Sequence, residues 1–180
     1  YLIAGDDDLL REDAAKLVRE AATKNHFSET QTFVQDSTFS WPQLLEACSA
    51  LSLFAEKRLI ELKLGSSKIG AEGSRTIIEC IAATSSSPDA DILLLINAPR
   101  IEGKPKWVSE ITAKGTYIPI FPLDAHQLPD WLTRRAKTIG LNLLGDAAAL
   151  LSERVEGNLV SAVQELEKLS LLANKDQSVS

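Results

Sequence analysis

The chain of 180 residues contains no methionine, only two cysteines and two histidines, and few aromatic side chains. No apolar run approaches the roughly 18 residues that cross a membrane. No basic segment followed by an apolar one opens the chain, as it would in a secretory signal. These absences predict a cytoplasmic protein that has no membrane partner.

The scarce cysteines and histidines give no sign of catalysis or of metal binding. Cys48 and Cys80 lie inside helix-like patterns without the spacing of metal ligands, so we expect reduced core residues. His26 and His126 lie in different segments, and neither is paired with a nucleophile. This pattern argues against a Ser-His-Asp or Cys-His arrangement. We therefore expect no catalytic residue and no metal ligand.

Basic residues are outnumbered by acidic ones, 19 against 25, which gives a formal charge of −6 and a pI near 5.0. Such a balance disfavours binding of nucleic acid through the overall field of the protein. If DNA is involved, we expect another protein to hold most of it.

The chain begins at Tyr1 inside a predicted strand and has no methionine. We therefore expect either a trimmed piece or a sequence from which modified methionines were dropped.

Short apolar segments alternate with amphipathic ones over the first two thirds of the chain. The predicted strands are Tyr1–Ala4, Thr30–Gln35, Arg58–Leu64, Ile92–Ile96 and Tyr117–Phe121. The predicted helices are residues 8–25, a segment opened by Ser40 as cap with Trp41 and Pro42, residues 72–84, and Pro105–Ala113. This alternation predicts an α/β fold with a parallel sheet and helices on both faces.

The pattern changes after Pro122, where three helical segments follow without a predicted strand. They are Leu128–Ile139, Gly145–Val155 and Asn158–Ala173, and Gly140 and Gly157 mark the breaks. We therefore predict a boundary near residue 124, with an α/β domain over 1–124 and a small three-helix domain over 125–180.

The turn after the first strand lacks the elements of a phosphate-binding loop. It reads GDDDLLR over residues 5–11, with one glycine, no lysine and no hydroxyl for magnesium. Three carboxylates stand where a polyanion would bind, and each close pair of like charges costs on the order of a few kcal/mol. ATP is thus a poor ligand here. A divalent cation on Asp6–Asp8 is an alternative, but acidic residues that open a helix are far more often caps.

A pair of apolar residues follows the helix that opens at Trp41. Trp41, Leu44, Leu45 and Cys48 share one face, and Ser52 would continue it. Leu53 and Phe54 would lie roughly 120° and 140° away from that face, on opposite sides.

Two interpretations of this pair remain open. Either the helix stops at Leu51 and both side chains pack under the next strand, or Leu53 and Phe54 project toward a partner. Their burial against a partner could contribute roughly 3 to 6 kcal/mol. Micromolar affinity takes about 8 kcal/mol, so the surrounding contacts would have to supply the rest.

Three segments resemble one known family, the delta subunit of bacterial DNA polymerase III. They are residues 49–58 (SALSLFAEKR), residues 1–7 (YLIAGDD), and residues 156–159 (EGNL) with 167–172 (EKLSLL). They resemble, respectively, the clamp-contacting region of that family, its opening strand with a degenerate phosphate loop, and the last helices of its lid. The resemblance covers nearly the whole chain.

The resemblance implies an AAA+-like fold of the P-loop NTPase type without nucleotide binding or any cofactor, followed by a three-helix lid. It implies that Leu53 and Phe54, with Leu51 and Ser52, bind the beta sliding clamp and help to open it. The chain would then be non-catalytic, although it would belong to a holoenzyme that is a nucleotidyltransferase. It would act in the bacterial cytoplasm, at the nucleoid, and contact DNA only indirectly. The family's collar domain, which joins the other loader subunits, is expected to be missing here.

Two other functions remain alternatives at this stage. One is an active AAA+ ATPase motor subunit of a clamp loader, which the loop at Gly5 disfavours because it lacks the lysine and the hydroxyl. The other is a degenerate α/β adaptor that binds another protein or nucleic acid.

Overall fold

The computed structural model describes residues 1–50, 57–66, 68–85, 91–172 and 178–179. They form two compact units, Tyr1–Phe121 and Pro122–Ser180. Within these described ranges, no helix combines the length and the apolar character that a membrane crossing requires.

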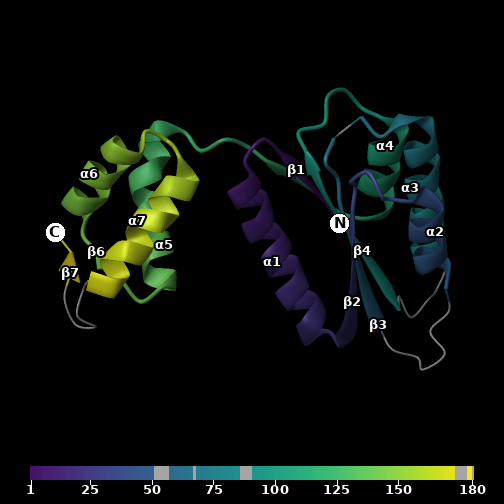
Figure 1. Ribbon diagram of the computed structural model, residues 1–180, viewed down its shortest axis with the longest axis horizontal. Helices are drawn as coiled ribbons and strands as arrows, with labels where there is room; N and C mark the ends of the chain where they lie inside the picture. The colour runs from purple at the N-terminus through teal and green to yellow at the C-terminus, as the bar shows by residue number, and fades with distance from the viewer. Residues whose placement is uncertain (51–56, 67, 86–90, 173–177, 180) are drawn as a thin grey trace. The chain divides into compact units, whose positions relative to one another are not determined.

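The first unit is built on a parallel five-stranded sheet in the described residues, with the strand order β2-β3-β4-β1-β5. The strands are β1 (Leu2–Gly5), β2 (Phe27–Val34), β3 (Lys57–Lys63), β4 (Ile92–Pro99) and β5 (Tyr117–Ile120). The helices are α1 (Asp8–Lys24), α2 (Trp41–Ser49), α3 (Gly70–Ser85) and α4 (Lys106–Lys114). Helix α1 covers one face of the sheet, and α2, α3 and α4 lie on the other (Figure 1). The predicted α/β architecture is confirmed.

Alternation along the strands divides the core between the two faces of the sheet. Leu2, Ile60 and Ile96 pack with the helices α2, α3 and α4. Ile3 and Leu95 pack on the opposite face, where α1 lies. Leu2, Ile3, Ile60 and Leu95 are fully buried, and Ile96 is nearly so. The sheet is therefore apolar on both sides, which is why its inner strands read as continuous hydrophobic runs.

Helix α1 begins at the acidic turn, as predicted. The side chain of Asp7 accepts a hydrogen bond from the backbone N–H of Leu10 at 2.8 Å, and Asp8 occupies the first turn. Both groups place negative charge at the positive end of the helix dipole. Just beyond the other end of the helix, His26 has a φ of 68°, the left-handed conformation that ends the helical path.

Several details of the first unit differ from the sequence prediction. Strand β4 continues to Pro99, three residues beyond Ile96. Strand β2 begins at Phe27, three residues earlier than Thr30, because its pairing with β3 extends to Lys57. Ser40 does occupy the N-cap of α2, but in the described structure its side chain makes no capping hydrogen bond. Pro42 stands in the first turn, where its missing N–H costs nothing.

The second unit contains α5 (Leu128–Thr138), α6 (Gly145–Val155) and α7 (Leu159–Leu172), preceded by the short 3-10 turn η1 (Ala125–Gln127). The three helices pack on one another through buried residues. These residues include Leu132, Ala136, Ala148, Leu151, Ala162 and Leu166. Positive φ angles at Gly140 and Gly157 turn the chain after α5 and α6.

The prediction that this unit has no strand was wrong. Asn142–Leu143 (β6) pairs in parallel with Ser178–Val179 (β7). A two-residue strand carries no alternation that periodicity could detect, so sequence patterning could not find the pair.

Candidate functional site

The last residue of β1, just before the turn where a nucleotide would bind in a fold of this type, is closely packed against β5. Gly5 pairs in register with Ile120. A Cβ at Gly5 would lie 2.6 Å from the Cβ of Ile120 and would overlap its carbonyl oxygen. Gly5 is therefore required for the close approach of two strands.

Arg11 crosses this turn to the end of β4. Its Nη1 donates to Oδ1 of Asn97 at 2.6 Å, and its Nη2 pairs with the carboxylate of Asp8. The Arg11 side chain is only 11% exposed, and Asn97 is buried. The chain's own guanidinium thus links the β1–α1 turn to the strand end that would face a nucleotide.

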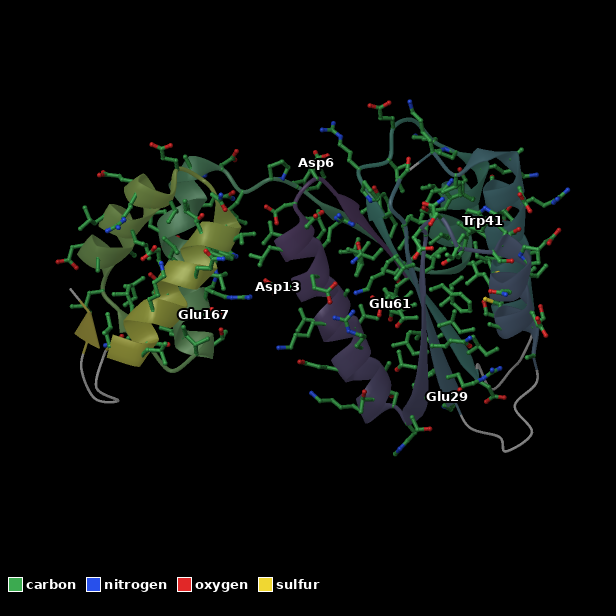
Figure 2. All side chains as sticks on the ribbon, in the orientation of Figure 1. Asp6, Asp13, Glu29, Trp41, Glu61 and Glu167 are labelled. Atoms are coloured by element: carbon green, nitrogen blue, oxygen red, sulfur yellow. The ribbon has the colours of Figure 1, made fainter. Side chains whose placement is uncertain are left out.

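The carboxylate of Asp6 lies at the surface of the turn. Asp6 is paired with Arg100, whose Nη1 is 3.4 Å from its Oδ2. Figure 2 shows Asp6 at the top of the turn between β1 and α1. Among the described residues, no group of three histidine, cysteine or acidic side chains is placed to hold a metal ion.

The two cysteines lie on the helices that face each other, α2 and α3. Cys48 and Cys80 are both buried, and no disulfide joins them, as predicted. A hydrogen bond with Cys48, together with burial, raises the pKa of the Cys80 thiol far above its ordinary value. The neutral thiol form is favoured, which suits a role in packing.

Helix α2 is fixed against α3 by an aromatic contact that the sequence did not reveal. A Cβ added at Gly73 would lie 2.8 Å from Cη2 of Trp41, so the indole rests directly on the backbone of α3. The ring of Phe39 packs edge-on against Trp41, with centroids 4.7 Å apart. Leu44 and Cys48 on the same face of α2 are buried. The predicted apolar face of α2 is therefore a core contact.

The predicted partner-binding residues follow this helix directly. Helix α2 ends at Ser49, and its C-cap Ala50 has an extended backbone, so the helical face projected from Trp41 ends before Ser52. Leu51, Ser52, Leu53 and Phe54 lie outside the described residues. The structure describes the elements on either side of this segment. They are α2 with its C-cap Ala50, and β3, which begins at Lys57.

The parallel sheet with helices on both faces has the AAA+-like P-loop NTPase fold. Its β1–α1 turn departs from the phosphate-binding pattern of that class. Among solved structures, the chain is similar to the Bacillus subtilis DNA clamp loader delta protein. The TM-score is 0.65 at 19% identity, covering 99% of this chain and 55% of that one. It is also similar to the RuvB Holliday junction branch migration motor of Thermotoga maritima, with a TM-score of 0.60 at 13% identity over 92% of this chain and 52% of that one. These likenesses show the fold.

Sequence comparison places the chain within that class. The family model "DNA polymerase III, delta subunit" matches residues 1–121, so the chain belongs to the DNA polymerase III delta subunit family. Subunit delta of Escherichia coli is 30% identical over 175 residues, and that of Haemophilus influenzae is 27% identical over 178. Each alignment covers 96% of this chain and 50% of the relative. The chain spans about half the length of the curated relatives it matches.

Proposed function

We propose that this chain is a non-catalytic clamp-loader component that binds a ring-shaped sliding clamp in DNA replication. Leu53 and Phe54 are the principal contacts, and Leu51 and Ser52 belong to the same surface. The observation that carries the proposal is the family match over residues 1–121, because the matched range contains this segment.

The geometry of the first turn supports the non-catalytic part of the proposal. At the β1–α1 turn, Gly5 is packed against Ile120 and Arg11 is hydrogen-bonded to Asn97, so both residues are already engaged with the chain's own atoms. Asp8 already neutralises part of the charge of Arg11, and a polyanion would also have to approach Asp6–Asp8. We therefore propose that ATP is not a ligand and that the neighbouring loader subunits supply the ATP-driven steps.

The mechanism in this proposal is a shift between two clamp populations. A ligand favours an open ring only to the extent that it binds the open form more tightly than the closed one. An apolar pair that enters a pocket beside the ring interface provides such a difference if the pocket changes shape on opening. The chain then stabilises the open ring and performs no chemistry.

The domain division, the other partners and the place of action are part of the same proposal. The division near residue 124 separates the clamp-binding AAA+-like domain from a helical lid. The second group of partners is the other loader subunits, contacted through the helical collar that the family carries, and DNA is contacted indirectly. The place of action is the bacterial cytoplasm, at the nucleoid.

A binding measurement with purified sliding clamp from the source bacterium tests the proposal. The unchanged chain, immobilised on a biosensor surface, should bind the clamp, and Leu53→Ala combined with Phe54→Ala should abolish binding without lowering the melting temperature. A matched control replaces another leucine and another phenylalanine, Leu17 and Phe121, which are 67% and 74% exposed, with alanine. The control should bind like the unchanged chain. Equal binding by all three proteins would remove the site assignment, and no binding by any of them would remove the function.

A further inference from the structure

A pocket of about 580 Å³ opens in the first unit beyond the carboxyl ends of β3 and β4. Two segments line it, residues 68–74 at the start of α3 and the stretch from Arg100 to Trp107 between β4 and α4. It lies at the end of the sheet where Figure 2 labels Asp6, since Arg100 is paired with that residue. Ligands of open α/β sheets bind outside the carboxyl ends of the strands, so the pocket lies at the functional end of this sheet.

Basic side chains are concentrated around the pocket. Lys68 and Arg100 line it, and Lys104 and Lys106 stand on either side of Pro105, which also lines it. These four basic residues, which make up a basic rim, are all exposed. Within the described part of the chain, only Arg100 of the rim is paired with a carboxylate. A local positive region thus exists on a chain whose formal charge is −6.

Acidic groups offset part of this charge without filling the pocket. Glu102 is the one acidic residue among the described residues that line it, and Glu72 lies in the first turn of α3. The ion pair of Arg100 with Asp6 is 3.4 Å long, and its two side chains are 71% and 49% exposed. An exposed pair of this kind is weak, so Arg100 can exchange Asp6 for another anion.

The backbone adds positive charge to that of the rim. Helix α3 begins at Gly70 and α4 begins at Lys106, and both of these helix starts adjoin the pocket. The N-cap of α4 is Pro105, and no side-chain hydrogen bond caps this helix in the described structure. Its first N–H groups and its dipole therefore act in the same direction as the four side chains of the rim.

The kind of partner follows from what this surface lacks. Ile69 and Trp107 line the pocket but are buried, and the exposed large apolar side chains of the described residues lie elsewhere. The centre of a protein–protein interface is poor in charge and rich in aromatic anchors. Interfaces with DNA are more polar and much more positive, and most of their hydrogen bonds reach phosphate and sugar. The rim matches the second description.

We propose that the basic rim, Lys68, Arg100, Lys104 and Lys106, binds the phosphate backbone of DNA directly. The family acts in DNA replication, so DNA is the polyanion that this surface meets. The proposal goes beyond the proposed function, in which DNA is contacted indirectly, and it involves neither the clamp nor the clamp-binding residues. Contacts to phosphate carry no sequence information, so the rim holds DNA of any sequence.

Fluorescence anisotropy of a labelled DNA duplex with a single-stranded overhang measures this binding. Each neutralised phosphate releases counterions, so three or four contacts predict that raising the salt from about 50 to about 200 mM weakens binding about 40- to 150-fold. The triple variant Lys68→Gln, Lys104→Gln and Lys106→Gln should bind more than tenfold more weakly at the lower salt. With only Arg100 left in the rim, its affinity should fall only about fourfold over the same salt range.

A second triple variant is the matched control. Lys16→Gln, Lys24→Gln and Lys168→Gln remove the same amount of charge from exposed positions outside the rim. The control should bind DNA within about twofold of the unchanged chain, because screening confines each contact to its surroundings. Equal weakening by both triple variants would show that net charge, and not the rim, attracts DNA, and would overturn the proposal. Equal melting temperatures exclude a loss of folding as the cause.

Two further outcomes would also overturn the proposal. One is that the unchanged chain leaves the anisotropy of the DNA unaltered at low salt. The other is that a polyglutamate peptide displaces the labelled DNA as well as unlabelled DNA does, since the rim would then fit an acidic protein segment. The biosensor measurement with sliding clamp keeps the two proposals apart. Clamp binding without DNA binding removes only this inference, and DNA binding through the rim without clamp binding removes only the proposed function.

Discussion

Nη1 of Arg19 in α1 lies 2.8 Å from Oε1 of Glu61 in the middle of β3. Glu61 is the one charged residue whose burial the described structure shows to be nearly complete, at 3% side-chain exposure. Figure 2 shows it between α1 and the strands. A carboxylate in such a place needs a partner, because removing it from water costs several kcal/mol. Helix α1 is therefore tied to β3 by charge as well as by the apolar contacts beneath it.

Replacing Arg19 with methionine should destabilise the fold strongly. The change keeps most of the apolar stem but leaves Glu61 with Lys63 as its remaining partner, at 3.8 Å. Leaving a buried charge uncompensated costs about 3–5 kcal/mol, and because Lys63 remains near Glu61 we expect a loss toward the lower end of that range. Urea denaturation at neutral pH measures the free energy of unfolding.

The double variant Arg19→Met with Glu61→Leu is the informative control for that experiment. Replacing both partners by apolar groups removes the buried charge, so most of the lost stability should return. A single variant that loses less than about 1 kcal/mol would show that the pair is effectively solvated.

Glu12 makes the stability depend on pH in a defined direction. Burial would raise the pKa of its carboxyl group, but the hydrogen bond and charge of Arg19, with the charge of Lys63, lower the pKa below its usual 4.5. A lowered pKa in the folded state means that the stabilisation is complete above about 4.5 and is lost as the pH falls through the folded value.

Glu12→Gln tests this directly. Since Glu12 is 48% exposed, solvent screening limits the loss of stability at pH 7 to less than about 1 kcal/mol. The difference between the two proteins in free energy of unfolding should shrink as the pH is lowered from 5 toward 2. A difference that grows over this interval would show that the carboxylate is not stabilised by its neighbours.

The sequence predicted the elements of the first unit because its signals are local. The acidic run Asp6–Asp8 as a helix cap and Gly5 as a strand end are read from a few neighbouring residues. The roles of Arg11 and Arg19 could not be predicted in this way. Their side chains bind partners 86 and 42 positions away in sequence, and those partners are brought into reach only when the sheet has formed.

Replacing Arg11 with methionine should destabilise the protein without creating a nucleotide site. The change removes a charged donor from the buried Oδ1 of Asn97, which costs about 1.5–3 kcal/mol. The Asp6–Asp8 carboxylates and the close β1–β5 contact remain. Thermal unfolding gives the stability, and titration with a fluorescent ATP analogue gives the affinity, which we expect to be weaker than millimolar for both proteins.

Arg100→Met provides the comparison for Arg11. Its ion pair with Asp6 is longer and its side chain is 71% exposed, so the loss should stay below about 1 kcal/mol. Micromolar binding of the ATP analogue by the unchanged chain would reverse the interpretation of the turn and favour an ATPase.

Gly5→Ala, which adds one methyl group at the end of β1, should destabilise the fold strongly. The new Cβ would overlap the backbone of Ile120, which cannot move without opening the β1–β5 pairing. Overpacking of this kind costs about 1–3 kcal/mol, and more where backbone must shift.

Gly145→Ala is the control, because it adds the same group at the start of α6, where nothing lies within 4 Å. Alanine should be neutral there, or stabilising by up to about 1 kcal/mol. If Gly5 is retained for the close approach of β1 and β5, chemical denaturation should show a clear loss of stability for Gly5→Ala and no loss for Gly145→Ala. A Gly5→Ala variant as stable as Gly145→Ala would mean that the space beside Gly5 accepts a methyl group, and steric crowding would then not disfavour a bound phosphate at the turn.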